Sequence, residues 1–591
     1  MLQGIFRRKS LNALLTTAEE GHGFGTLKRS LGAFQLTLLG IGAIIGAGIF
    51  STVGTAAAGG GEHPGAGPAI MLSFVITAIT CGFAALCYAE FASMVPISGS
   101  AYTYSYATLG ELVGWIIGWD LILEYAIGNV AVAISWSGYF QELLRGFGIH
   151  FPGWLSIDYR TAAQAARQVA EAQAAGQDAL ATLGAAAVRA SEALAGAPHF
   201  LGIPIVFNLP AFLIVMLVTW VLVIGIRESA WFNSSMVILK LAIIVFFIAM
   251  GAHYVKPENW HPFAPNGATG VLSAAAIIFF AYIGFDAVST AAEETKNPGR
   301  DLPIAILSSL VICTIIYMLV AVVLTGMLPS SQLGTAEPLA TAFSGLGMKW
   351  PALVISLGAV FATTSVLVVF QLGQPRIFFS MARDGLLPKW AAKVHPKYQT
   401  PHVTTILAGV VVALFAGVAN IGEVVDLTNI GTLFAFVLVC IGVTILRFRE
   451  PERPRAFRVW GGPWLVPMLG VASCIGLMVY LPPASWWRFV GWLVLGMSVY
   501  FAYGYHHSAV GRESGRTQTA SFHQRLMALG SFLAAVGLFV IPHNAGPAQL
   551  FRELVSTAEG DHTRALVGLS LIGVGLLAVA VGAVGARRQN A

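Results

Sequence analysis

The sequence contains 591 residues, of which 56% are hydrophobic and 10% are charged, with a net charge of +5 and a mean hydropathy of +0.75. A soluble domain carries roughly 25% charged residues, so this composition excludes a water-soluble globule and indicates a membrane protein. The basic residues lie in loops between apolar segments, where membrane topology explains them better than binding to nucleic acid does. The five cysteines lie in apolar runs without metal-ligand spacing, which predicts neither disulfides nor a metal site.

Apolar segments of about 20 residues, the length that crosses a bilayer, follow one another along the chain. Fourteen spans are expected, at 33–57, 67–93, 110–142, 204–226, 230–252, 268–292, 303–328, 350–382, 402–420, 425–447, 463–482, 488–506, 524–543 and 563–586. Most lysines and arginines fall in the loops on the side of the N-terminus, which predicts a multi-pass protein of the cell membrane with both termini in the cytoplasm. Residues 1–30 lack the pattern of a cleavable signal, so we expect a cytoplasmic segment there and take the first span as the insertion signal.

The first span contains the stretch GIGAIIGAGIF at residues 40–50, with four glycines. Gly42 and Gly46 form a G-x-x-x-G pair, which is typical of close helix packing in lipid. The alternative is a broken helix, because unwound backbone at membrane depth lines cavities, where its free N–H and C=O groups bind ligands. Glycine suits both, since it permits unusual torsions and close approach.

A long loop at residues 145–203 is rich in alanine, with spaced arginine, glutamate, glutamine and aspartate residues. Alanine is the best helix former, so we expect one or two short helices packed on the extracellular face. The simpler interpretation is an insertion without transport chemistry, and the alternative is a docking surface for a partner.

The sixth span carries a matching interruption, since FFAYIGFDAVST at residues 279–290 has a glycine at mid-depth. Transporters with discontinuous helices carry them at corresponding positions of two halves. The pair therefore favours a five-plus-five inverted repeat and a broken helix as the reason for the glycines. The predicted domains are the segment 1–30, a first repeat at 31–252 with its 145–203 insertion, a second repeat at 253–448, spans eleven and twelve at 449–506, and spans thirteen and fourteen with a short tail at 507–591.

These stretches, together with AEETKNPGRDLP at 292–303 and RIFFSMARDGLLPKWAAKVHPKYQTP at 376–401, resemble the amino acid–polyamine–organocation superfamily and specifically its cationic amino acid transporter branch. The resemblance covers residues 30–505 apart from the insertion. It implies an all-α polytopic membrane protein with the LeuT-like fold, a 5+5 inverted repeat whose helices 1 and 6 are discontinuous. The fourteen expected spans suit that branch.

An amino acid presents a carboxylate and an ammonium, and each broken helix offers a match for one of them. N–H groups at the start of the half-helix after the first break suit a carboxylate, and carbonyls released at the second break suit an ammonium. By resemblance the carboxylate side is formed around Ile44, Gly46, Ala47 and Gly48. The ammonium side is formed by Phe280, Ala281 and Ile283, with Phe280 also acting as a gate.

Lys240 lies deep in the fifth span, within SSMVILKLAIIVFFIAM, where a charge costs about 3 kcal/mol on insertion scales. The resemblance implies that this lysine stands where sodium-coupled relatives hold a sodium ion between spans one and eight. Its expected contacts are the carbonyl of Gly42 and the hydroxyls of Thr364 and Ser365. The inferred coupling ion is H⁺, because a lysine withdrawn from water can lose and regain its proton.

Two acids complete the predicted site. Glu124 in span three, with Asp120 one turn before it, faces the substrate side chain, helps to relay protons, or is a structural acid. Asp286 is either a charge beside the substrate or a stabiliser of the helix break.

No nucleophile, zinc or phosphate-binding motif and no repeated pore filter is found, so neither an enzyme nor a channel is expected. We predict a secondary active L-amino acid transporter, H⁺-coupled and Na⁺-independent, that works by alternating access and prefers arginine, lysine or ornithine. Small neutral amino acids such as alanine, an exchange mechanism and a non-transporting sensor are the alternatives. We expect no cofactor, no metal and no nucleic acid; the expected partners are the amino acid, H⁺, membrane lipid including sterol, and a small single-span membrane protein.

Overall fold

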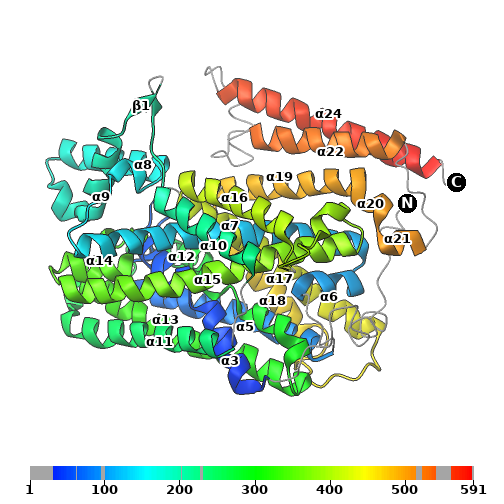
Figure 1. Cartoon of the computed structure of the whole chain (residues 1–591), viewed down its shortest axis with the longest axis horizontal. Helices are drawn as coiled ribbons and strands as arrows, with labels where there is room; N and C mark the ends of the chain where they lie inside the picture. Colours follow the sequence, from blue (N-terminus) through cyan, green and yellow to red (C-terminus); the bar gives the residue numbers. More distant parts are fainter. Residues whose placement is uncertain are drawn as a thin grey trace.

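The computed structural model describes residues 31–60, 63–94, 100–200, 203–225, 230–398, 400–513, 522–540 and 561–588. The predicted segment 1–30 and the loop before the last predicted span lie outside these residues. The described chain is helical apart from one hairpin, in which β1 (His199–Phe200) pairs antiparallel with β2 (Ile203–Pro204). Figure 1 shows the long helices running side by side in one bundle.

The first half of the chain reaches the end of the fifth predicted span. Its helices are α3 (Ala33–Ile44), the π-helix η1 (Gly48–Thr52), α4 (Val53–Ala58), η2 (Gly67–Ala69), α5 (Ile70–Met94), α6 (Ser100–Thr108), α7 (Glu111–Gly146), η3 (Gly153–Leu155), α8 (Tyr159–Ala174), α9 (Ala179–Ala195), α10 (Leu209–Ile224) and α11 (Ala230–Gly251). The second broken segment and its surroundings follow as η4 (Ala252–Tyr254), η5 (Pro257–Trp260), α12 (Gly267–Ile278), η6 (Phe279–Tyr282), η7 (Phe285–Glu294) and α13 (Pro298–Met327).

The remaining elements complete the bundle. They are η8 (Ser330–Gln332), α14 (Pro338–Gly345), α15 (Lys349–Arg383), η9 (Lys389–Ala392), α16 (His402–Val418), α17 (Ile421–Arg449), α18 (Leu465–Val479), α19 (Pro483–Val499), the π-helix η10 (Tyr500–Gly504), α20 (Tyr505–His507), α21 (Ala509–Glu513), α22 (Phe522–Val540) and α24 (Asp561–Arg588). A polar side chain caps several of these helices, as with Asn420, whose amide oxygen accepts from the N–H groups of Gly422 and Glu423 at the start of α17.

Each predicted span contains a helix, but the number of crossings is not fixed by length alone. Among the described residues, seven helices are each long and apolar enough to cross a membrane, and counting the two sharply bent helix pairs as single spans brings this to nine. Three further apolar helices are shorter, at Leu209–Ile224, Gly267–Tyr282 and His402–Val418. The fold is thus an all-α polytopic membrane fold, and the count of fourteen spans stays a prediction.

The broken helices lie at the first and sixth predicted spans, as the five-plus-five repeat requires. The first is the pair Ala33–Ile44 and Gly48–Ala58, which bends by 41°. The second changes from α12 through η6 to η7, a run of ten residues in 3₁₀ conformation. Because a 3₁₀ run longer than a few residues is uncommon, this stretch is a local departure from α-helix that the surrounding packing must stabilise.

The alanine-rich insertion contains two helices, α8 and α9, which pack on each other at one end of the bundle (Figure 1). Asp158 caps α8 by accepting from the N–H of Thr161 at 2.9 Å. The insertion is tied to the start of α17 by an ion pair between Arg160 and Glu423 and by a hydrogen bond of 2.8 Å from the Asn420 amide to the Thr161 hydroxyl.

The last two helices, α22 and α24, pair with each other and run beside α19 (Figure 1). Two glycine pairs let the helices approach closely, since a methyl group on Gly530 would lie 2.6 Å from the carbonyl oxygen of Gly575. Ser498 on α19 donates to the carbonyl of Ala528 on α22 at 2.9 Å, which joins the pair to the rest of the bundle.

Candidate functional site

The first helix break covers Ile45, Gly46 and Ala47, all buried in the centre of the bundle. The helix α3 ends as the N–H of Ile45 donates to the carbonyl of Ile41 at 2.9 Å, and Ile45 itself is extended. The π-helix η1 begins at Gly48. The first N–H groups of a helix have no partner within it, so the start of η1 offers donors at membrane depth.

The second break lies at Ile283 and Gly284. Ile283 is extended, and Gly284 has a φ of +119°, a conformation that glycine adopts without strain and other residues rarely do. The predicted ammonium-side residues lie around this break, and all three side chains, those of Phe280, Ala281 and Ile283, are buried.

The two breaks pack directly against each other. A methyl group on Gly48 would lie 2.2 Å from the Cα of Ala281, and one on Gly284 would lie 2.7 Å from the carbonyl oxygen of Ala43. Each break therefore has a glycine against the backbone of the other. None of Gly40, Gly42, Gly46 and Gly48 has a positive φ, so in the first span glycine serves close approach rather than an unusual torsion.

Side chains from other helices replace the hydrogen bonds that the breaks remove. On the first break, the Tyr317 hydroxyl of α13 donates to the carbonyl of Ile44 at 3.0 Å. On the second, the Asn429 amide of α17 donates to the carbonyls of Ala276 at 2.7 Å and Ile277 at 2.9 Å. Unpaired backbone groups are costly in a membrane interior, so Tyr317 and Asn429 keep the broken conformation stable. Sequence patterns did not single out either residue, because an isolated tyrosine or asparagine in a span gives no sign of its partner.

Lys240 lies at the middle of α11, with 2% of its side chain exposed. Its ammonium donates to the carbonyl of Gly42 at 3.0 Å. Gly42 belongs to the last turn of α3, whose carbonyls lack helical partners and carry the negative end of the helix dipole. The lysine is thus held by the end of a broken helix.

The two hydroxyl residues predicted beside Lys240 lie on α15. Thr364 donates to the carbonyl of Val360 at 2.7 Å and accepts from the indole of Trp136 at 2.9 Å, so its hydroxyl already has these two partners. Ser365 is partly buried and immediately precedes Val366, which lines the cavity described next.

A small cavity of about 30 Å³ lies between α3, α7, α15 and the second break. It is lined by Gly42, Ala43, Glu124, Tyr125, Ile283, Gly284, Asp286, Val366, Val369 and Phe370. Four predicted site residues therefore line the same cavity: Gly42, Glu124, Ile283 and Asp286. Ile44, Gly46, Ala47, Gly48, Phe280 and Ala281 lie at the breaks but are not on its wall.

The cavity is small compared with the pockets that hold small molecules in other proteins. Pockets that hold small molecules measure roughly 300–1,000 Å³, about ten times or more the volume present. The contact between Gly48 and Ala281 closes the space where the predicted carboxylate and ammonium sides would meet.

Buried polar contacts join the two broken segments near both of their ends. Leu31, before α3, forms a parallel bridge with Thr295, after η7, and its carbonyl accepts from the N–H of Lys296 at 2.9 Å. Beyond α4, His63 contacts the Ser273 hydroxyl of α12 at 3.0 Å and the Asp426 carboxylate of α17 at 2.7 Å. The two broken segments are thus linked to each other near both of their ends.

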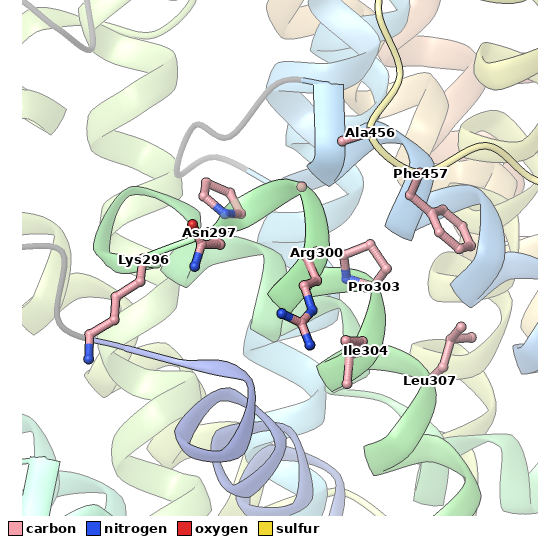
Figure 2. Close-up of a pocket in the computed structure, with 10 residues that line it drawn as sticks. Lys296, Asn297, Arg300, Pro303, Ile304, Leu307, Ala456 and Phe457 are labelled. Carbon is pink, nitrogen blue, oxygen red and sulfur yellow. The ribbon is translucent and has the colours of Figure 1, made fainter.

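A much larger hollow, about 690 Å³, lies at the start of α13. Figure 2 shows Arg300, Pro303, Ile304 and Leu307 on one side of it, with Ala456 and Phe457 on the other. Lys296 and Arg300 are exposed there, and the hollow holds none of the predicted site residues. The smaller cavity is the candidate site, because it alone of the two combines broken backbone with buried ionisable groups.

Comparison with known proteins shows to which family the chain belongs. A family model described as amino acid permease matches residues 31–500. The branched-chain amino acid permease of Bacillus subtilis (strain 168) is 46% identical over 509 residues, which covers 86% of this chain and 99% of the relative.

Two further relatives carry different names. The methylthioribose transporter of the same organism is 43% identical over 511 residues, covering 86% of this chain and all of the relative. The vacuolar cationic amino acid transporter 4 of Arabidopsis thaliana is 35% identical over 459 residues, covering 76% and 68%. The chain therefore belongs to the amino acid permease family, within the amino acid–polyamine–organocation superfamily.

Proposed function

We propose that this chain is a secondary active transporter of L-amino acids that is driven by protons, does not need sodium and works by alternating access. The observation that carries the proposal is the hydrogen bond of 3.0 Å from the buried Lys240 ammonium to the Gly42 carbonyl. Carbonyls at the end of a broken helix are where transporters of this kind bind their coupling cation. Here a covalently attached ammonium takes that place.

The ammonium differs from a bound sodium ion in one useful respect, since it can release a proton. Gly42 also lines the cavity, so a movement of the first break that admits substrate changes the lysine's only hydrogen-bonded partner among the described residues. Substrate binding and the proton affinity of Lys240 would thereby be linked. Such linkage is what a symporter requires.

The two breaks supply complementary poles for a zwitterion. The N–H groups at the start of η1 suit the carboxylate and the carbonyls near Ile283 suit the ammonium. The two poles lie across the Gly48–Ala281 contact, so the amino acid would take the place of that contact when the breaks separate.

The proposed substrate is a neutral aliphatic amino acid of the branched-chain type. The cavity wall is largely apolar at Ile283, Val366, Val369 and Phe370. The branched-chain permease also matches over nearly its whole length, whereas the plant cationic transporter matches over about two thirds of its own. Cationic amino acids are the second candidate, favoured by two carboxyl groups, those of Glu124 and Asp286, on the same wall.

Uptake into proteoliposomes tests the proposal. Purified protein is reconstituted without sodium, and radiolabelled leucine uptake is measured with an inward proton gradient, with and without a protonophore. We expect accumulation that collapses with the protonophore and falls about tenfold or more in Lys240→Ala. Lys349→Ala, which removes an exposed lysine at the start of α15, is the matched control and should accumulate leucine as the wild type does.

Competition by unlabelled arginine, alanine and methylthioribose identifies the substrate class in the same vesicles. Inhibition by arginine alone would replace the aliphatic assignment with the cationic one, and inhibition by methylthioribose alone would remove amino acids altogether. Sodium-dependent uptake, or gradient-driven uptake by Lys240→Ala equal to wild type, would contradict the role of Lys240. Leucine binding without flux under any gradient would indicate a sensor.

A further inference from the structure

Asp120 is a buried acid that the site described above does not use. It lies on α7 one turn before Glu124, and its side chain is 0% exposed. Neither carboxyl oxygen has a hydrogen-bond partner among the described residues. By contrast Glu111, on the same helix, accepts from the Tyr500 hydroxyl at 2.8 Å and from the Ser508 hydroxyl at 2.6 Å.

The neighbours of Asp120 hold it close to the opposite backbone. A methyl group on Gly431 of α17 would lie 2.7 Å from its Oδ1. The adjacent Trp119 stacks on Trp492 of α19 with ring centroids 4.6 Å apart, and each indole donates to the other's backbone carbonyl, at 2.9 and 3.1 Å. The carboxyl is therefore packed against backbone beside a rigid tryptophan pair.

The ionisable groups around this stretch do not neutralise a negative charge. Towards the cavity they are Glu124 on α7 and Asp286 on η7, which are both acids. On α15 the Gln374 amide donates to the carbonyl of Ile122 at 3.3 Å, and the nearby Arg376 is exposed.

Three further helices packed on α7, namely α17, α19 and α6, add no free cation among the described residues. On α17 the ionisable residue nearest in sequence to Gly431 is Asp426, which contacts His63. On α19 the charged residue is Arg488, which pairs with Glu423 at 3.1 Å. On α6 the hydroxyl of Tyr102 donates to Asp384 at 2.7 Å.

An ionised carboxylate without a partner is strongly disfavoured at such a position, so this packing suits a carboxyl that carries a proton. We propose that Asp120 is a proton-carrying residue of the transport cycle, which exchanges a proton with Glu124 at the cavity. In that step the O–H bond of the Asp120 carboxyl breaks and an O–H bond forms on the Glu124 carboxylate, or the reverse. This inference rests on the proposed proton coupling.

Two measurements on the same proteoliposomes test it. Trapped pyranine reports leucine-driven proton uptake, and leucine counterflow at equal pH reports exchange without net proton movement. In Asp120→Asn, which keeps the shape of the neutral acid, proton uptake per leucine exchanged should fall about tenfold or more. Glu111→Gln is the matched control, because it removes a buried acid of the same helix that already has hydrogen-bond partners, and its ratio should equal that of wild type.

Asp120→Ser provides a second variant in case the asparagine protein does not fold, and it should show the same fall. Infrared difference spectra of wild type against either variant should lose the carbonyl band of a protonated carboxylic acid. A wild-type ratio in both variants, or loss of a carboxylate band instead, would overturn the assignment of Asp120 while leaving proton coupling intact. Wild-type protein that exchanges leucine without any proton movement would overturn proton coupling, and Asp120 with it. A fall in sodium-stimulated uptake would make the carboxylate a cation ligand and overturn its role with protons.

Discussion

The first and sixth predicted spans are both interrupted helices, but the backbone conformation at the two breaks differs. The first has no positive φ at any of its four glycines and bends by 41°. The second needs Gly284 at a φ of +119° and continues as a ten-residue 3₁₀ run. At the first break, the neighbouring backbone leaves no room for a side chain on Gly48. At the second, the same holds for Gly284, and its positive φ is a second reason for glycine.

The carbonyls at the two breaks are also satisfied differently. At the first, one acceptor is bound by the ammonium of Lys240 and another by the hydroxyl of Tyr317. At the second, both carbonyls are bound by the neutral amide of Asn429. Only the first break therefore has a titratable donor among these contacts, which places the proposed coupling on its side of the site.

Gly48→Ala should have the largest effect, because its methyl group would lie 2.2 Å from the Cα of Ala281 and backbone cannot move aside cheaply. Displacing one break from the other should lower leucine uptake by about a hundredfold. Gly476→Ala on α18, where nothing lies within 4 Å, is the control and should transport normally. Normal uptake by Gly48→Ala would mean that the breaks do not need their close contact.

Gly284→Ala should follow, because alanine at a φ of +119° is strained and its Cβ would lie 2.7 Å from the carbonyl oxygen of Ala43. We expect a loss of about 1–3 kcal/mol in stability, measured by thermal unfolding in detergent, together with slower uptake. A protein as stable as wild type would show that the second break relaxes to another conformation at no cost.

Asn429→Leu should come next, because it removes the amide that donates to the carbonyls of Ala276 and Ile277. The expected destabilisation is about 1–3 kcal/mol, again by thermal unfolding. Asn259→Leu, which removes a single amide contact to the carbonyl of Gly326, is the control, and its thermal unfolding should lie close to that of wild type. If the two substitutions destabilised the protein equally in thermal unfolding, Asn429 would have no special role at the break.

Gly46→Ala should have the smallest effect of the series. Its methyl group would lie 3.0 Å from Cγ2 of Val366, a side chain that can shift. The expected loss of stability is about 1 kcal/mol, the low end for added bulk in a packed site, and adding Val366→Ala, which removes the contacted methyl groups, should reduce the further cost of the Gly46 substitution. A loss as large as that of Gly48→Ala would show that the wall of the cavity is as rigid as the backbone contact.

The sequence allowed the helical fold to be predicted, because apolar length is read directly along the chain. Matching glycine interruptions in spans one and six also predicted where both helices break. The number of crossings could not be settled this way, since Leu209–Ile224, Gly267–Tyr282 and His402–Val418 are apolar but short.

The contacts across the site were harder to predict. The resemblance placed Lys240 beside Gly42, and the structure contains that hydrogen bond, but Thr364 bonds to Trp136 and Val360 instead. Tyr317 and Asn429 were missed because the sequence shows which residues are polar but not which carbonyl each one meets. Their roles depend on helix packing, which has no periodic pattern in the chain. The roles of the site residues in transport stay predictions.

A structure determined by electron cryomicroscopy in lipid nanodiscs with leucine would test the central claim most directly. The account predicts density between the two breaks, with the leucine carboxylate within hydrogen-bond distance of the N–H groups at Gly46–Gly48 and the ammonium facing the carbonyls near Ile283. Gly48 and Ala281 should be farther apart than in the closed arrangement described here. Leucine density elsewhere, such as in the hollow between Arg300 and Phe457, with the breaks still in contact, would contradict the account.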